Sequence, residues 1–337
     1  MKPLWITEAE VVDLLDLTQA IDALESALRM QAAGTAQTMS KTHSTWGAGH
    51  VLHAIGAASE GMDLVGAKSW AHTRHGATPL LLLWSAADGS LEAVIEAFAL
   101  GQMRTGAVSG VATRYMAGAD ASVLALVGAG EQALAQVAAI AAVRRLETVR
   151  VFSRSAEKRD SCAARVAELL PDLTVVRAAS VAQAAEGASI VTLVTRADRA
   201  FFQAQLAAPG AHINAVGAIT PEREEFAQDV FDRAGWLAAD DLPALFRLSR
   251  EFATRFGPQG KLAPVEQLCD IVAAGRGRAP ACDLSLFKAM GMGLSDLGLG
   301  AEVLKRARAA GAGRILEHPK RVTPRLAPHP VSRGALP

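Results

Sequence analysis

The segment Val127-Gly128-Ala129-Gly130-Glu131-Gln132-Ala133 constrains the fold of this chain more than any other feature. It stands between a short apolar run at 122–127, which suits a buried strand, and a helical pattern at 131–146. In a G-x-G-x-x-A segment so placed, the first glycine permits a tight turn, the second lets the backbone approach a pyrophosphate, and the small Ala133 permits close helix-to-strand packing. The segment therefore predicts a Rossmann-type dinucleotide-binding unit, and the alternative is a glycine turn that binds nothing.

Apolar and helical segments alternate after this turn. A helical pattern covers 156–170, and the expected strands lie at 149–153, 174–176, 189–194, 212–216 and 236–239. Strands that are apolar on both faces and joined by helices pair in parallel and are covered by helices on both sides. We therefore predict an α/β fold with a doubly wound parallel sheet.

The amino-terminal part of the chain follows a different pattern. An amphipathic helix is expected at 14–33, and short apolar strands follow at 50–57, 64–71, 79–85 and 91–95, the last after the turn signal Asp88-Gly89. This pattern predicts a small, mostly antiparallel sheet. A helix at 98–117 leads into the parallel unit, and a helix at 296–310 is expected to fold back on the amino-terminal domain.

Length and composition narrow the class of protein. A chain of 337 residues exceeds the ~250–300 at which one core usually stops growing, so two domains are expected. The 34 basic and 34 acidic residues cancel, which favours a small-molecule partner over nucleic acid or a membrane. Without a signal-like amino terminus or a long apolar stretch, we expect a cytoplasmic protein. Since no cysteine or histidine group has metal-ligand spacing, we expect no metal.

The loop after the second strand of the dinucleotide unit bears on the choice of cofactor. It reads Ser153-Arg154-Ser155, with Lys158 and Arg159 close behind, where an enzyme specific for NAD usually has a carboxylate. A carboxylate would repel a 2′-phosphate, whereas serine and arginine would bind one. The loop therefore favours NADP over NAD. In the alternative, Arg154 covers the adenine or lies in solvent.

Two cationic residues stand in apolar surroundings outside this unit. Arg104 lies in the helical pattern at 98–117, where a guanidinium needs an anion such as a carboxylate to offset its desolvation. Lys68 lies in a predicted strand, where a buried lysine can hold a carboxylate or donate a proton. A structural ion pair for Arg104 and a solvated ammonium group for Lys68 are the alternatives. The nearby His72 is a further candidate for lining the site.

These motifs, in this order along the chain, resemble the ornithine cyclodeaminase and μ-crystallin family over nearly the full length. The resemblance implies a homodimer, a substrate-binding and dimerisation domain at 1–114 completed by 292–316, and a Rossmann domain at 115–291. The tail at 317–337, rich in proline and arginine, is expected to be disordered. The matching segments are Gly66-Ala67-Lys68, Arg104-Thr105-Gly106-Ala107, Val127 to Gln132, Val151-Phe152-Ser153-Arg154-Ser155, Ile213 to Ala218, and Leu286 to Gly291 followed by Asp296.

The resemblance also implies roles for individual residues. Lys68 and Arg104 would bind the carboxylate of an imino or amino acid, with Lys41 as counterpart of a third cationic ligand. Lys68 is the first candidate for a proton donor and His72 the second, while Met290 would lie near the substrate and the nicotinamide. The residues implied to contact the cofactor are Thr78, Arg104, Gly128, Ala129, Gly130, Glu131, Gln132, Ser153, Arg154, Ser155, Lys158, Thr195, Val216, Gly217, Met290 and Gly291.

Two departures from the family pattern bear on the reaction. The aspartate that follows the Val-Gly-Gly segment of cyclodeaminases is Ile219 here, and a glutamate expected in an earlier strand is Val51. Both changes remove negative charge that would hold a second amino group. We therefore expect reduction of a cyclic ketimine or α-imino acid, such as a 1-pyrroline-2-carboxylate-like compound, by NADPH. A cyclodeaminase or an alanine-type amino-acid dehydrogenase, and a non-catalytic NADPH-binding protein of μ-crystallin type, are the alternatives.

Overall fold

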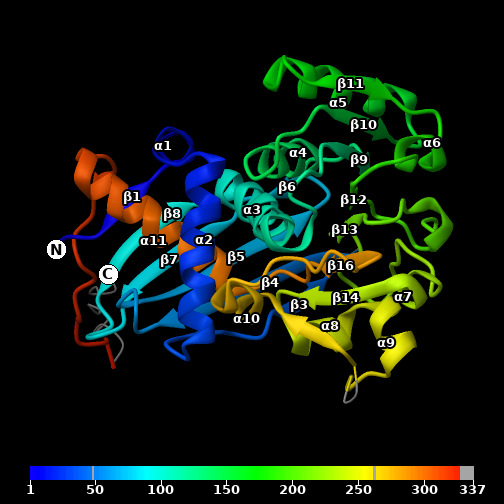
Figure 1. The fold of residues 1–337 in the computed structure, drawn as a ribbon. Coiled ribbons are helices and arrows are strands. Elements are labelled where there is room, and N and C mark those ends of the chain that lie inside the picture. Colours follow the sequence, from blue (N-terminus) through cyan, green and yellow to red (C-terminus); the bar gives the residue numbers. More distant parts are fainter. Residues whose placement is uncertain (48, 261–262, 327–337) are drawn as a thin grey trace, which may run out of the picture.

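The computed structural model describes residues 1–47, 49–260 and 263–326, which form two sheets joined by long helices (Figure 1). One sheet has eight strands, all pairing in parallel, and carries the glycine turn. The other has nine strands, pairs mainly antiparallel, and is built from the amino-terminal part of the chain and a short strand near its end. The predicted α/β fold with a doubly wound parallel sheet is confirmed.

The parallel sheet reverses direction beside the glycine turn. Its order is β11-β10-β9-β12-β13-β16-β14-β15, so β10 and β11 lie on one side of β9 and the later strands on the other. Ligands of such sheets bind at the carboxyl ends of the strands where the order reverses. The strands are β9 (Val123–Val127), β10 (Thr148–Phe152), β11 (Thr174–Arg177), β12 (Ile190–Leu193), β13 (His212–Ala215), β14 (Ala234–Ala239), β15 (Val265–Gln267) and β16 (Leu284–Lys288).

Short helices connect these strands. Ser155 caps the helix after β10 because its side chain accepts a hydrogen bond from the amide of Lys158. The connecting helices are α4 (Ala133–Ala141), α5 (Ala156–Leu169), α6 (Val181–Ala185), η1 (Ala204–Leu206), α7 (Val230–Arg233), α8 (Leu242–Leu248), α9 (Arg250–Phe256) and α10 (Leu268–Ala274).

The amino-terminal sheet has the order β17-β1-β8-β7-β5-β4-β2, with β3 paired to β4 and β6 to β5. Only the β1–β8 pair is parallel among its described strands. The strands are β1 (Leu4–Ile6), β2 (Ala36–Thr38), β3 (Thr42–Trp46), β4 (His50–Ser59), β5 (Leu64–Thr73), β6 (Gly76–Ala77), β7 (Leu80–Ser85), β8 (Leu91–Glu96) and β17 (Arg314–Ile315).

Three long helices join the two sheets into one core. The helices α2 (Leu17–Ala32) and α11 (Gly293–Ala310) pack against one another, and α11 also covers β4, β5 and β7 (Figure 1). The helix α3 (Phe98–Met116) packs on α2, α4 and α11. A Cβ on Gly106 would lie 2.7 Å from the carbonyl oxygen of Ala135, so α3 and α4 touch through their backbones. This contact sets Arg104 beside the glycine turn.

Several boundaries differ from the sequence-based expectations. The helix expected at 14–33 is α2, which begins only at Leu17 because Asp16 leaves the helical conformation and caps α2 through the amide of Gln19. A separate short helix that was not expected, α1 (Glu8–Leu14), precedes it. The helix expected at 131–146 spans only 133–141. The sequence-based expectation assigned no strand to β1, β2, β3, β6, β15, β16 and β17, most of them only two or three residues long.

The expected disordered tail at 317–337 is only partly described. Residues 317–326 have neither helix nor strand, and 327–337 lie outside the described residues. Among the helices of the described ranges, none has the length and apolar character needed to cross a membrane.

Candidate active site

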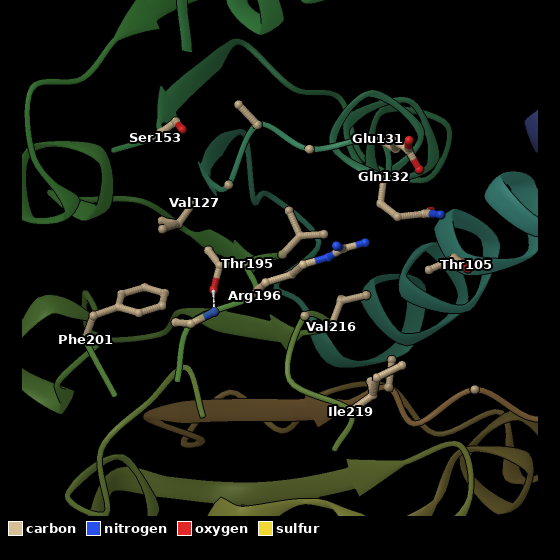
Figure 2. Close-up of a pocket in the computed structure, with 18 of the residues that line it drawn as sticks. Thr105, Val127, Glu131, Gln132, Ser153, Thr195, Arg196, Phe201, Val216 and Ile219 are labelled. Carbon is tan, nitrogen blue, oxygen red and sulfur yellow. Dashed lines mark hydrogen bonds between the residues drawn. The ribbon is translucent and has the colours of Figure 1, made fainter. Parts of the chain in front are cut away.

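A cavity of about 1090 Å³ opens at the carboxyl ends of the parallel strands (Figure 2), and Ile55 of β4 and Trp70 of β5 in the other sheet also line it. Both sheets and α3 contribute to its lining. The residues singled out from the sequence that line it are Lys41, Arg104, Gly128, Ala129, Gly130, Glu131, Gln132, Ser153, Arg154, Ser155, Lys158, Thr195, Val216, Gly217, Met290 and Gly291.

The glycine turn has a backbone that only glycine tolerates. Gly128 has φ of +121°, and a Cβ at this position would lie 2.5 Å from the carbonyl oxygen of Val194. Open space surrounds the Cβ position of Gly130, which faces the cavity. Within the described ranges, the backbone amides of Gly130 and Glu131 have no hydrogen-bond acceptor. The turn therefore fits a pyrophosphate, whose oxygens would accept from these amides at the start of α4.

The loop after β10 bounds the same cavity at its outer end. Ser153, Arg154 and Lys158 line it, and the Arg154 and Lys158 side chains are exposed. In the described residues no carboxylate of this loop faces the cavity. A ribose 2′-phosphate at the end of β10 would find a hydroxyl group and two cations.

A cluster of three cations and one carboxylate occupies the opposite end. Lys68 on β5 is 4% exposed and pairs with Asp296 on α11, which is 1% exposed. The Nε atom of Arg104 lies 3.5 Å from Oδ1 of the same aspartate. Two ammonium groups lie over the ring of Trp70, which is also on β5. The Lys41 ammonium lies 5.7 Å from the ring centroid and the Lys68 ammonium 5.3 Å from it. With one anion against three cations, the cluster carries excess positive charge.

Burial and mutual repulsion make these lysines weak bases. Desolvation, together with the charges of Arg104 and Lys68, lowers the pKa of Lys41 to about 8. Burial also lowers the pKa of Lys68, although Asp296 opposes that shift. Both ammonium groups therefore release a proton more readily than an ordinary lysine, and an additional carboxylate would stabilise their charged forms.

One part of the cavity wall is apolar. Ile55, Trp70, Val108 and Ile219 line it, and Ile219 follows directly after the Val216–Ala218 segment. Figure 2 shows Val216 and Ile219 on the side of the cavity opposite Ser153. No carboxylate occupies the position where cyclodeaminases have their aspartate.

The Met290-Gly291 turn forms part of the floor. The buried carboxylate of Asp240, at the end of β14, accepts hydrogen bonds from the amides of Met290 (2.7 Å) and Gly291 (2.8 Å). Burial raises the pKa of Asp240 to about 6. Gly291 has φ of +83°, a conformation that other residues rarely adopt, and its Cβ position lies 3.0 Å from an Arg104 nitrogen, so the guanidinium lies against this turn.

Some candidates from the sequence lie elsewhere. His72 and Thr78 are exposed at the far end of β5 and beyond β6, and neither lines the cavity. Lys68 lies behind the lining, in contact with Asp296. In the described ranges no group of three histidine, cysteine or acidic side chains is arranged to hold a metal ion.

The structure adds residues that the sequence did not single out for a role. Asp296 was recognised only as part of a matching segment, and its pairing with Lys68 depends on packing of α11 against β5. Trp70 lies two residues beyond Lys68, on the same face of β5, so strand alternation offered a signal. Arg196, directly after Thr195, extends across the cavity toward α3 and α4 (Figure 2). Its position just beyond the end of β12 was the available signal.

A doubly wound sheet with this glycine turn at its switch point defines a Rossmann dinucleotide-binding protein. Within this class the chain belongs to the ornithine cyclodeaminase/mu-crystallin family, whose model matches residues 1–311. The family includes enzymes that use nicotinamide cofactors on small amino and imino acids.

Three relatives illustrate the range of the family. The alanine dehydrogenase of Archaeoglobus fulgidus is 25% identical over 322 residues, covering 93% of this chain and 98% of the relative. The ketimine reductase mu-crystallin of Rattus norvegicus is 30% identical over 219 residues, covering 64% and 66%. A solved structure of Thermococcus litoralis Δ1-pyrroline-2-carboxylate reductase in complex with NADH and L-proline is 22% identical, with a TM-score of 0.86 over 93% of this chain and 100% of that one.

Proposed function

We propose that this protein reduces a cyclic ketimine or α-imino acid, such as 1-pyrroline-2-carboxylate, to the corresponding α-amino acid with a nicotinamide dinucleotide. The observation that carries the proposal is the cluster of Lys41, Lys68 and Arg104 at one end of a dinucleotide cavity, in which Lys68 and Arg104 pair with the carboxylate of Asp296. Net positive charge in a largely buried position suits one added carboxylate.

The cluster would bind the substrate carboxylate and thereby orient the imine. Arg104 lies on α3, beside the Met290-Gly291 turn, and its guanidinium can engage a carboxylate through two parallel hydrogen bonds. A substrate held in this way would turn its imine carbon toward the cavity between Arg104 and Val216. Positioning of this kind lowers the activation barrier of a hydride transfer by a large amount.

The apolar wall favours a cyclic substrate without a second charged group. Ile55, Trp70 and Ile219 offer contact to methylene groups and no partner for an ammonium group. The family also includes a lysine cyclodeaminase and an alanine dehydrogenase. Their reactions are the alternative for this chain. The apolar Ile219 argues against a diamine as the substrate, because it offers no partner for a second ammonium group.

The reaction requires one hydride and one proton. A reduced nicotinamide dinucleotide held by the glycine turn and the Met290-Gly291 turn would supply the hydride for the imine carbon, and this chain would have to supply the proton for the imine nitrogen. Lys68 is our candidate for the proton donor, since burial lowers its pKa, and Lys41 is the second ammonium of the cluster. His72 is a weaker candidate because it is exposed at the far end of β5, and within the described residues no hydrogen bond or ion pair joins it to this cluster.

We propose NADP(H) in preference to NAD(H). Ser153, Arg154 and Lys158 at the end of β10 support this choice, since they offer a hydroxyl group and two cations to a 2′-phosphate. We further propose a homodimer whose contact includes β3 and β4 of the domain at 1–114. Trp46 and Leu52 on these strands are 44% and 45% exposed, which is unusual for large apolar side chains on neighbouring strands.

The test combines binding and turnover. Purified protein is titrated with NADPH and NADH, and oxidation of the reduced cofactor is then followed at 1-pyrroline-2-carboxylate, 1-piperideine-2-carboxylate and acyclic imines, with ornithine, lysine and alanine tested in the oxidative direction. Turnover of a cyclic imine supports the proposal. Turnover of a diamine or of alanine alone replaces it with the alternative, and tight binding without any turnover indicates a ligand-binding protein.

A further inference from the structure

A second group of buried charges lies beneath the cavity floor. Glu225 is fully buried, and its carboxylate accepts four hydrogen bonds. One oxygen accepts from the amide (2.6 Å) and the hydroxyl group (2.8 Å) of Thr195, and the other from the amides of Gly217 (2.8 Å) and Ala218 (3.2 Å). Thr195 follows β12 and Gly217 follows β13, so this single side chain ties together the ends of two neighbouring strands.

The segments after β12 and β13 are in close backbone contact. A Cβ on Gly217 would lie 2.0 Å from the carbonyl oxygen of Thr195 and 2.5 Å from the Glu225 carboxylate. Both Thr195 and Gly217 line the cavity, and Figure 2 shows Thr195 and Val216 facing it from adjacent strand ends. A change in the hydrogen bonds of Glu225 would therefore move part of the cavity floor.

A buried ammonium group balances this carboxylate. Lys288, the last residue of β16, is fully buried, and its Nζ atom lies 3.6 Å from a carboxylate oxygen of Glu251 on α9. That oxygen also accepts from the amide of Glu225 (3.0 Å), while the other Glu251 oxygen accepts from the hydroxyl group of Ser249 (2.6 Å). Within the described ranges the Nζ atom of Lys288 has no hydrogen-bond partner. Its charge pairs with Glu251 and also favours the ionised form of Glu225.

We propose that Glu225 is a positioning residue for the nicotinamide end of the dinucleotide, and that Lys288 keeps it in the ionised form that accepts all four hydrogen bonds. The inference rests on the proposed function only in taking the ligand to be a nicotinamide dinucleotide. A protonated Glu225 would direct an O–H group toward a donor, and at least one of the four bonds would be lost.

The charges around Glu225 determine how this arrangement responds to pH. The charged side chains that face it in the described part of the chain are Lys288 on β16 and Glu251 on α9. Burial raises the pKa of Glu225, and the charge of Lys288 acts in the opposite direction. Replacing Lys288 by methionine removes that opposing charge at nearly constant side-chain volume, so Glu225 would stay protonated to a higher pH.

The experiment measures dinucleotide affinity without substrate, by fluorescence titration with NADPH and NADH between pH 6 and 9. The variants are Lys288→Met, Glu225→Gln, the double variant Lys288→Met with Glu251→Gln, and the exposed control Glu222→Gln. We expect Lys288→Met to bind about tenfold more weakly than the wild type at pH 6.5 and to recover toward pH 9. Glu225→Gln should bind more weakly at every pH. The double variant restores the net charge of the cluster and should return the wild-type profile.

The outcomes separate positioning from a purely structural role. Unchanged affinity in Glu225→Gln, or a loss in Lys288→Met that is equal at all pH values and is not rescued by the double variant, overturns the inference. Thermal melting of each variant shows whether a loss of affinity that is equal at all pH values comes from unfolding of the variant. A wild-type protein that binds neither dinucleotide overturns the proposed function as well, whereas the variant results bear on Glu225 alone.

Discussion

Arg104 on α3 and Asp296 on α11 approach to 3.5 Å between guanidinium Nε and carboxylate Oδ1, although one residue lies ahead of the parallel sheet in the chain and the other follows it. The same oxygen pairs with Lys68. Asp296 therefore holds two cations from different elements in one place. One oxygen of this aspartate, Oδ2, has no hydrogen-bond partner in the described residues. The cluster is thus assembled by tertiary packing of α3, α11 and β5.

Replacing Arg104 by leucine should impair substrate binding far more than cofactor binding. Loss of a charge-assisted pair with a carboxylate costs about 2–3 kcal/mol, which corresponds to an increase in KM of roughly 30- to 150-fold for the imino acid. The dissociation constant for NADPH should change by less than about threefold. Steady-state kinetics and a cofactor titration measure the two effects. Arg255→Leu, which removes an exposed partner of Asp232, is the control, and an unaltered KM in Arg104→Leu would remove Arg104 from the substrate site.

Lys41 should give the reaction an alkaline limit. Its pKa is about 8, so the ammonium group loses its proton, and with it the attraction for a carboxylate, as the pH rises through that value. We expect KM for the imino acid to increase above pH 8 in the wild type. Lys41→Arg keeps its charge and should move this limit upward, whereas Lys41→Met should have a high KM at all pH values. A wild-type limit that persists unchanged in Lys41→Met would assign it to another group.

The sequence alone predicted the parts of this molecule that depend on local patterns. The glycine turn, the strands on either side of it and the loop at 153–155 could be located because their spacing follows from backbone geometry. Arg104 and Lys68 were found as charges in apolar segments, whereas Lys41 was implied only by the family resemblance. The pairing of Arg104 and Lys68 with Asp296 was not predicted. That pairing is defined by how α11 packs on β5, a contact between distant segments that periodicity does not encode.

The same limit explains the residues that the sequence-based reading missed or placed less well. His72 is near Lys68 in the chain, yet β5 carries it beyond the cavity because the strand extends about 3.3 Å with each residue. Glu225 and Lys288 lie in segments without a recognisable charge pattern, and their importance appears only when the strand ends are brought together. Local sequence patterns predict helices and strands, whereas a network of buried charges can be recognised only from the packed structure.

The loop at 153–155 should determine the choice between the two dinucleotides. Replacing Ser153 by aspartate introduces a negative charge at the end of β10, which repels a 2′-phosphate and can accept hydrogen bonds from ribose hydroxyl groups. We expect the ratio of kcat/KM for NADPH to that for NADH to fall at least about tenfold in this variant, and Arg154→Ala to lower the same ratio by about as much. Arg165→Ala, on the exposed side of α5, is the control. A constant ratio in both variants would show that the loop does not contact the 2′ position.

A buried histidine should make the fold sensitive to acid. His212 on β13 is fully buried between the Ser285 hydroxyl group and the Asn214 side-chain oxygen, which lie 3.0 and 3.2 Å from its ring nitrogens. Burial lowers the pKa of His212 to about 3, whereas in the unfolded chain it has the ordinary value of 6.5. Between these values the unfolded chain binds the extra proton, so the stability contribution is complete above pH 6.5 and is lost as the pH falls toward 3.

The free energy of unfolding should therefore decrease by up to about 1.4 kcal/mol for each pH unit below 6.5 through this residue. Replacement of His212 by asparagine removes the titrating group, so this variant should start from lower stability at pH 7.5 and lose less on acidification. Urea unfolding of the wild type and the variant at pH 7.5, 6.0 and 5.0 gives the comparison, with His75→Asn in the exposed turn between β5 and β6 as control. If the difference in unfolding free energy between wild type and His212→Asn stays constant across these pH values, the histidine is not the source of the acid sensitivity. If it narrows as the pH falls, the neutral ring of His212 is a stabilising element of the junction between β13 and β16.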